Sequence, residues 1–234
     1  MFRWKRLSLL TAILLVVSLA APEAAAKKKK KKRSKKEPTV ATGTLDDGKL
    51  EVAWFSGGGL AFVEADEIDY LWVKEDFSMD GRTFHFEEWP DPEFLGEGAS
   101  ERDENDRRLA RQMNADMGRS FAESLGPVFG SKAQTSTSEG DIRVEGRIVD
   151  CSTGNNAAKL LVGFGAGAGY TTVDLKFTDK ASGDLLAAIH HRVVSGTSWS
   201  TTDSKFFKWI KKMGEELADN GFWGHYQDGD PVDD

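Results

Sequence analysis

Cysteine is nearly absent from this sequence, since Cys151 is the only one among 234 residues. A single thiol excludes a disulfide within the chain, and it also excludes zinc-ribbon and redox-pair motifs, which need clustered cysteines. We expect Cys151 to be a small buried residue rather than a nucleophile. The length and the seven tryptophans are sufficient for one folded domain with a sizeable core.

Histidine is also scarce, with four in the chain. His190 and His191 are neighbours on a predicted strand, so their side chains leave opposite faces and cannot share one metal ion. We expect His190 on the polar, solvated face and His191 in the core. The acidic C-terminus lacks the spacing of a calcium loop. The sequence therefore predicts no metal site, no cofactor, no catalytic residue and no enzymatic activity.

Basic residues are concentrated in one short segment. From Pro38 onward the chain has 19 basic and 36 acidic residues, a net charge of −17. Proteins bind nucleic acids chiefly by placing Lys and Arg on phosphates, so nucleic acid is not an expected partner of this part.

The first 26 residues have the parts of an export signal in the right order. A basic start precedes an apolar run at residues 7–21, and three alanines at residues 24–26 suit cleavage. The apolar run is shorter than the roughly 20 residues that span a bilayer. We expect a cleaved signal peptide and a mature protein in the periplasm or outside the cell.

Nine positive charges follow this signal, within residues 27–36. Positive residues beyond an apolar segment resist transport across the membrane, so an uncleaved anchor in the inner membrane is the alternative. In the exported protein, residues 27–38 are predicted to be a disordered linker and an electrostatic tether to anionic membrane surfaces. The charged residues of this lysine arm are Lys27, Lys28, Lys29, Lys30, Lys31, Lys32, Arg33, Lys35 and Lys36.

The folded part is predicted as a single domain, residues 39–222, followed by a loose acidic tail at residues 223–234. Apolar residues recur at every fourth position of a helix predicted for residues 100–125, with a capping box of Ser100 and Asp103 and a stop at Gly126. A second helix is predicted for residues 202–220.

Alternating apolar and polar residues predict most of the strands, and Val173, Leu175 and Phe177 give the clearest alternation. Strands are predicted at residues 70–77, 83–86, 142–151, 170–178 and 185–195, and a hairpin at residues 49–55 with 60–64. This order predicts an α+β fold, a two-layer sandwich in which both helices pack on an antiparallel-rich sheet.

A glycine-rich loop precedes the strand at residues 170–178, with Gly163, Gly165, Gly167 and Gly169 at alternate positions. The pattern satisfies a relaxed dinucleotide-binding fingerprint, but a strand follows it where that fingerprint requires a helix. We expect the glycines to let a helix or another backbone segment approach closely.

These segments together resemble a bacterial domain of unknown function, family 4410. The similarity is carried by the strand at residues 142–148, Gly154 with Lys159, the run at residues 162–167, the alternation from Val173 to Phe177, and the turn at Ser182 and Gly183. The resemblance covers residues 69–221 and implies an exported envelope protein, often a lipoprotein, without an established activity. This chain has no cysteine at the cleavage site to accept a lipid.

Aromatic residues gather near the C-terminus. Trp209 lies off the apolar stripe of the second helix, and Phe222, Trp223 and Tyr226 follow its end. We expect them to fold back over a sheet edge, with an interaction surface as the alternative.

The sequence thus predicts an exported cell-envelope protein that acts as a non-enzymatic binding or structural module. Its expected partner is an envelope protein or a cell-wall component. The alternative is a small-ligand-binding protein or enzyme that uses the glycine-rich loop.

Overall fold

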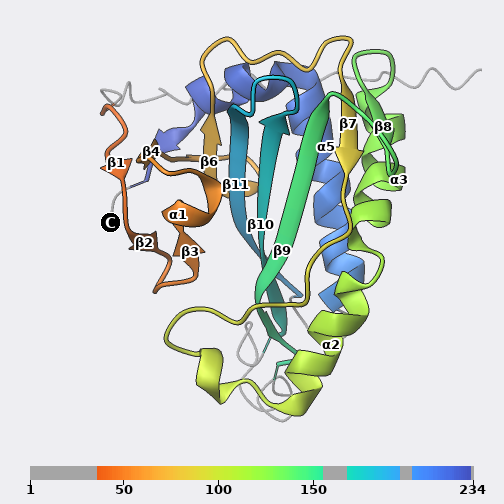
Figure 1. The fold of residues 1–234 in the computed structure, drawn as a ribbon. Coiled ribbons are helices and arrows are strands. Elements are labelled where there is room, and N and C mark those ends of the chain that lie inside the picture. The colour runs from red at the N-terminus through yellow and green to blue at the C-terminus, as the bar shows by residue number, and fades with distance from the viewer. Residues whose placement is uncertain (1–35, 155–167, 196–201, 233–234) are drawn as a thin grey trace, which may run out of the picture. The chain divides into compact units, whose positions relative to one another are not determined.

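The computed structural model describes residues 36–154, 168–195 and 202–232. Its centre is an eight-stranded mixed sheet (Figure 1). In sheet order its strands are β12 (Asp230–Pro231), β5 (Val63–Ala65), β6 (Ile68–Val73), β11 (Leu185–Val194), β10 (Tyr170–Asp179), β9 (Ile142–Ser152), β7 (Thr83–Phe86) and β8 (Gln134–Ser136). Neighbouring strands are antiparallel, except that β7 runs parallel to both β8 and β9.

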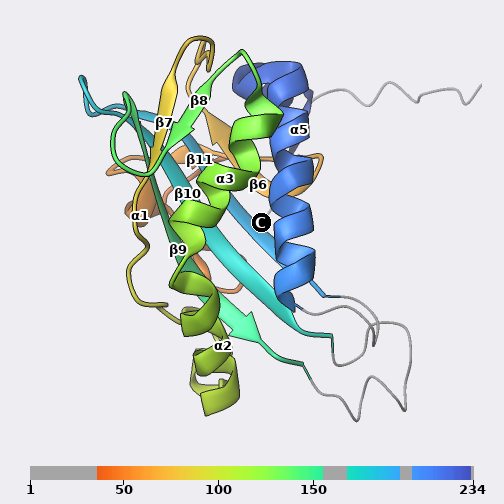
Figure 2. The same cartoon turned by 90° about the vertical axis from the view of Figure 1, so that its right-hand side faces the viewer.

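The long helices cover one face of this sheet (Figure 2). They are α2 (Glu104–Asn114), α3 (Met117–Phe129) and α5 (Thr202–Asp228). α5 contacts α3 as well as β6 and β11, so the helices and the sheet enclose one core, in which Phe84, Phe177 and Phe222 are fully buried. The predicted α+β sandwich is confirmed. No helix among the described residues is both long and apolar enough to cross a membrane.

The central strands were predictable because they alternate. Val173 and Leu175 are fully buried against the helices, and all three predicted strand ranges agree with β9, β10 and β11 to within one residue. Between β10 and β11 the Asp179 side chain accepts hydrogen bonds from the next turn, and Gly183 takes the positive φ of 78° that closes the hairpin.

The single helix predicted for residues 100–125 is wrong, because the chain forms two. Asp103 rather than Ser100 is the N-cap, and its carboxylate accepts from the amides of Asn105 and Asp106. An α-helix has 3.6 residues per turn, so apolar residues spaced four apart move about 40° further around the helix axis at each step. Along one straight helix the apolar stripe would therefore rotate away from the sheet. The break between α2 and α3 turns the apolar residues of α3 back toward it.

The end of α3 also differs from the prediction. The helix continues past Pro127 to Phe129, which is buried in the core, and it stops at Gly130, where φ is 59°. Burial of one more aromatic ring outweighs the single backbone hydrogen bond that Pro127 lacks.

The predicted loose tail after residue 222 is wrong over residues 223–232. The backbone kinks at Gly221, where φ is 71°, and a further helical stretch runs to Asp228. β12 then pairs with β5 at the sheet edge. Burial of Phe222 and His225, which are 0% and 3% exposed, fastens this end to the fold.

The predicted N-terminal hairpin is also wrong. Val52–Phe55 is the short helix α1, and two small pairs surround it: β1 (Val40–Ala41) with β4 (Leu60–Ala61), and β2 (Thr44–Leu45) with β3 (Leu50–Glu51). These elements lie over the sheet face opposite the helices (Figure 1). We call residues 40–62 the cover segment.

Two further predictions concerned the chain before α2. The strand predicted at residues 70–77 is β6, which begins earlier and ends at Val73, where a turn with Asp76 at a φ of 58° follows. The strand at residues 83–86 is confirmed as β7, and it pairs with β9 rather than continuing β6.

Candidate functional site

A row of charged residues crosses the three central strands beneath the cover segment. Asp174 of β10 lies opposite Arg147 of β9 on one side and His190 of β11 on the other. Residues paired across antiparallel strands point to the same face, so all three leave the sheet on the side away from the helices. Arg147, Asp174 and His190 are 3%, 0% and 1% exposed.

His190 lies between two carboxylates. Its Nδ1 is 2.5 Å from Asp174 Oδ1, and its Nε2 is 3.2 Å from Asp46 Oδ2 in the cover segment. An ionised carboxylate only accepts hydrogen bonds, so two ionised partners favour the imidazolium form, in which both ring nitrogens donate. Burial alone lowers the pKa of an imidazole, but the hydrogen bonds to Asp174 and Asp46 outweigh it and raise the pKa of His190 above 6.5. The same bond lowers the pKa of Asp46 below 3.8.

Arg147 extends the row. Its Nε donates to Asp174 at 2.8 Å, while its two terminal nitrogens reach Glu93 at 3.1 Å and Glu51 at 3.3 Å. The indole of Trp54 lies over the guanidinium, 4.6 Å from ring centroid to carbon. A buried arginine is thereby surrounded by acceptors and one aromatic face.

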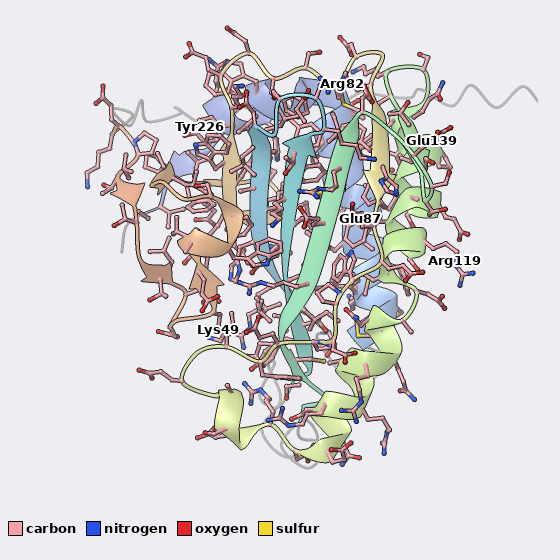
Figure 3. The ribbon with its side chains drawn as sticks, in the orientation of Figure 1. Lys49, Arg82, Glu87, Arg119, Glu139 and Tyr226 are labelled. Carbon is pink, nitrogen blue, oxygen red and sulfur yellow. The ribbon has the colours of Figure 1, made fainter. Side chains whose placement is uncertain are left out.

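The row fastens the cover segment to the sheet. Asp46, Glu51 and Trp54 belong to that segment, and each contacts His190 or Arg147. Lys49 (Figure 3) is buried beside Asp46 and Asp47, with amine-to-carboxylate distances of 4.0 and 3.9 Å. Acidic side chains of the cover segment thus pair with the buried cations Arg147 and His190 of the sheet.

A second polar cluster lies where the described chain stops before and resumes after residues 155–167. Arg102 donates to both carboxylate oxygens of Asp150, at 2.7 and 3.1 Å, and the Tyr170 hydroxyl donates to Asp150 at 3.0 Å. Burial, and then the Asp150 charge, raises the pKa of Tyr170 to about 12. The Arg192 guanidinium carbon lies 3.8 Å from the Tyr170 ring centroid.

Neither His190 nor Cys151 is placed to act as a reactive group. Both nitrogens of His190 are engaged, and burial raises the pKa of the Cys151 thiol to about 11. Cys151 is fully buried, as predicted. No group of three or more His, Cys, Asp or Glu residues within the described ranges is placed to hold a metal ion.

His190 was predicted to be solvated, and that prediction is wrong. Its face of the sheet is polar, as expected, but the cover segment buries it. His191 does point to the core side, where its ring stacks on Trp209 at a centroid distance of 4.6 Å. The sequence signal that was missed is that Arg147, Asp174 and His190 each occupy a polar-face position near the middle of a central strand.

The interaction surface, the alternative interpretation of the C-terminal aromatic residues, is wrong for two of the four. Trp209 and Phe222 are core residues, 4% and 0% exposed. Trp223 and Tyr226 are half-buried and stack on each other at 5.3 Å between centroids, and the Tyr226 hydroxyl donates to the carbonyl of Ala61 (Figure 3). Packing, the expected interpretation, describes this group.

The other predicted site residues fall largely outside the described residues. Gly163, Gly165 and Gly167 do so, whereas Gly169 is buried and its carbonyl accepts from the amide of Ser195 at 2.7 Å. Of the lysine arm only Lys36 is described, and it is exposed.

Comparison with solved structures gives low similarity over most of the chain. PelC from Paraburkholderia phytofirmans, a dodecamer solved with and without a methionine substitution, is 10% identical and covers 63% of this chain and 92% of its own, with TM-scores of 0.40 and 0.39. Protein XCC0632 from Xanthomonas campestris, of family DUF330, is also 10% identical, covers 67% and 92%, and has a TM-score of 0.37.

No curated protein matches this sequence. The family model described as Domain of unknown function (DUF4410) matches residues 72–199, more than half of the chain. This match spans the central strands and the helices α2 and α3 that pack on them. The chain therefore belongs to the DUF4410 family of domains of unknown function.

Proposed function

We propose that the protein is an exported cell-envelope protein whose folded part is a non-enzymatic binding or structural module. One observation carries the second half of this proposal: the charged row of Arg147, Asp174 and His190 is closed. Each of these side chains is at least nine-tenths buried, and their hydrogen-bonding atoms face one another, the cover segment or Glu93. A general acid or base must reach its substrate, and these groups do not.

The proposed location rests on the sequence. Residues 1–26 have the order of an export signal, and the lysine arm suits attachment to anionic envelope surfaces, with about 1 kcal/mol for each Lys close to a charged membrane. The acidic folded part, at −17, favours partners that are neutral or basic. An envelope protein or a cell-wall component is the proposed partner class.

A second candidate is a small-ligand-binding protein or enzyme that uses the glycine-rich loop. It is favoured by the cluster at the ends of that loop, where Arg192 lies over Tyr170 and Arg102 holds Asp150. Two guanidinium groups beside a loop are suited to an anionic ligand.

The experiment begins with cell fractionation of the full chain and mass spectrometry of its N-terminus. A product that starts at Lys27 in the envelope or outside the cell supports the proposal, and an intact N-terminus in the inner membrane contradicts the cleaved form. Envelope extract is then passed over the purified domain, in parallel with thermal-shift screening against nucleotides and inorganic phosphate. Capture of one envelope component, with no thermal shift, supports the module over the ligand-binding alternative.

Arg192→Gln is the matched variant for both the capture and the thermal-shift measurements. It removes a guanidinium at the second cluster and leaves the charged row unchanged. A thermal shift by phosphate that this variant abolishes would move the assignment to the second candidate.

A further inference from the structure

The first half of α5 carries a run of positive charge that stands out from the acidic folded part. Residues 204–214 contain four lysines and no acidic residue, although the net charge from Pro38 onward is −17. α5 lies on the outer side of the sheet, next to α3 (Figure 2). We call the following five residues the basic stripe: Lys205, Phe207, Lys208, Lys211 and Lys212.

The helical period turns the basic stripe away from the core. Phe207, Lys208 and Lys211 are exposed, and Phe207 and Lys211 are neighbours one turn apart. The Phe207 side chain is 42% exposed, and it is the only exposed aromatic residue within the described ranges. The opposite side of the same turns is buried in the core and consists of Phe206, Trp209, Ile210 and Met213.

The charges of the basic stripe are only partly compensated. Lys211 lies 3.8 Å from Glu215 on the next turn, and Lys212 pairs with Glu67. These side chains are exposed to solvent, and exposed ion pairs contribute little to stability, so they compete weakly with an external anion. Lys205 and Lys208 form no ion pair with a carboxylate of the described residues.

The kind of cation narrows the class of partner. Arg82, Arg102 and Arg147 each hold a carboxylate of the fold in a fixed position, whereas the basic stripe has lysines only. The arginine fork suits protein carboxylates, while an ammonium is a point charge on a flexible stem and imposes no geometry. An anionic lipid surface presents charges without fixed positions, and an apolar layer beneath them accepts an aromatic ring.

We propose that the basic stripe is a docking surface for an anionic lipid membrane. Its lysines lie at the lipid phosphates, and the Phe207 ring enters the boundary between headgroups and acyl chains. This inference goes beyond the proposed function, which gives the contact with anionic surfaces to the lysine arm. It assigns a second contact to the folded part, where it orients the domain on the membrane.

The test places a reporter in the stripe of the full chain. Phe207→Trp is mixed with vesicles of phosphatidylglycerol and phosphatidylcholine whose brominated acyl chains quench nearby indoles. The parent chain measures the background from the seven native tryptophans. We expect the variant to add quenching that rises with the fraction of phosphatidylglycerol and falls as salt rises. Vesicles of phosphatidylcholine alone are expected to add none.

Lys208→Gln with Lys211→Gln, made in the reporter chain, is expected to weaken the contact by about tenfold or more. The reason is that each Lys close to an anionic membrane contributes about a fivefold factor to binding. The matched control is Lys74→Gln with Lys180→Gln, which removes the same charge beside the turn between β10 and β11. That turn is at the end of β11 opposite to the one that leads into α5, so the added quenching is expected to be retained.

Absence of added quenching on anionic vesicles overturns the proposal. Equal losses in the two double variants overturn it as well, because the effect would then follow net charge and not the stripe. Binding of a glutamate-rich peptide that requires Lys208 and Lys211, without added quenching, would assign the stripe to an acidic protein instead. Because the reporter lies in the stripe, its signal does not register a contact made by the lysine arm only.

Discussion

His190 and Asp174 lie on neighbouring strands with 2.5 Å between Nδ1 and Oδ1, and both are buried. On its other side the ring meets Asp46, which is 144 residues away in sequence. The imidazolium is thus the cation that joins one strand of the sheet to the next and to the cover segment. The buried carboxylate of Asp174 and the partly exposed carboxylate of Asp46 both pair with it.

His190→Gln is expected to destabilise the fold by about 3–5 kcal/mol, because it removes a buried cation that pairs with both Asp174 and Asp46 and leaves Arg147 as the remaining cationic partner of Asp174. Urea unfolding measures the loss. His85→Gln is the matched control: His85 is half-buried on β7 beside Lys180, and its loss is expected to stay within about 0.5 kcal/mol. Equal effects of the two substitutions would contradict the assigned role of His190.

Stability is expected to depend on pH through the same pair. The raised pKa of His190 gives stability that is complete below its ordinary value of 6.5 and is lost as pH rises through the folded value. The lowered pKa of Asp46 gives stability that is present above 3.8 and is lost as pH falls through the folded value. These two groups place the maximum between 3.8 and 6.5.

Urea midpoints measured across this range test the prediction. The decline on the alkaline side should be much smaller in His190→Gln than in the wild type, because the titrating group is gone. A decline of the same size in both proteins would assign it to other groups.

The strands of this site were predictable from the sequence, whereas its assembly was not. Alternation is a local property, and Asp174 was correctly placed on the polar face of its strand. That Asp174 meets Arg147 and His190 depends on strand order and register. That the row is buried depends on the cover segment, whose sequence predicted a hairpin and which instead forms a helical turn with Val52 and Phe55 inward.

Trp209 shows a second reason for incomplete prediction. A single apolar stripe assumes that a helix packs on one surface, and Trp209 lies off that stripe. α5 packs on both α3 and the sheet, so a wider face is buried, and the indole donates to the carbonyl of Glu67. A periodic pattern identifies a helix but does not show how many neighbouring elements the helix packs against.

Gly118→Ala is expected to destabilise the fold by about 1–3 kcal/mol, the usual cost of overpacking. The added methyl would be 2.2 Å from a backbone oxygen, which cannot rotate away. Gly224 in α5 is the matched control, since its nearest neighbour would be 4.0 Å away. Gly224→Ala is expected to be neutral or to stabilise by up to about 1 kcal/mol. Thermal unfolding of both variants measures the difference, and similar melting temperatures would contradict the close approach.

Cys151 is expected to react slowly with iodoacetamide in the folded protein. Burial raises the pKa of its thiol from 9.0 to about 11, so the thiolate fraction near pH 8 falls by about a hundredfold. Labelling of folded and urea-unfolded protein, followed by mass spectrometry, compares the two rates. Rapid labelling of the folded chain would reopen a nucleophilic role for this residue.

Deleting residues 27–36 is expected to leave the melting temperature unchanged, because this arm has no apolar group with which to join the core. Binding to anionic vesicles should fall with the deletion. In the intact chain it should also fall as salt rises, since the Debye length shrinks from about 10 Å at 0.1 M to about 3 Å at 1 M. Sedimentation with vesicles measures both effects.

The control for the arm replaces its nine cations with serine and keeps its length. Loss of binding in this variant assigns the effect to charge. The acidic folded part, at −17, offers a competing partner for the arm within the same molecule. Little vesicle binding at any salt concentration is the expected sign of that competition. Binding that persists at high salt and survives the deletion would contradict an electrostatic tether.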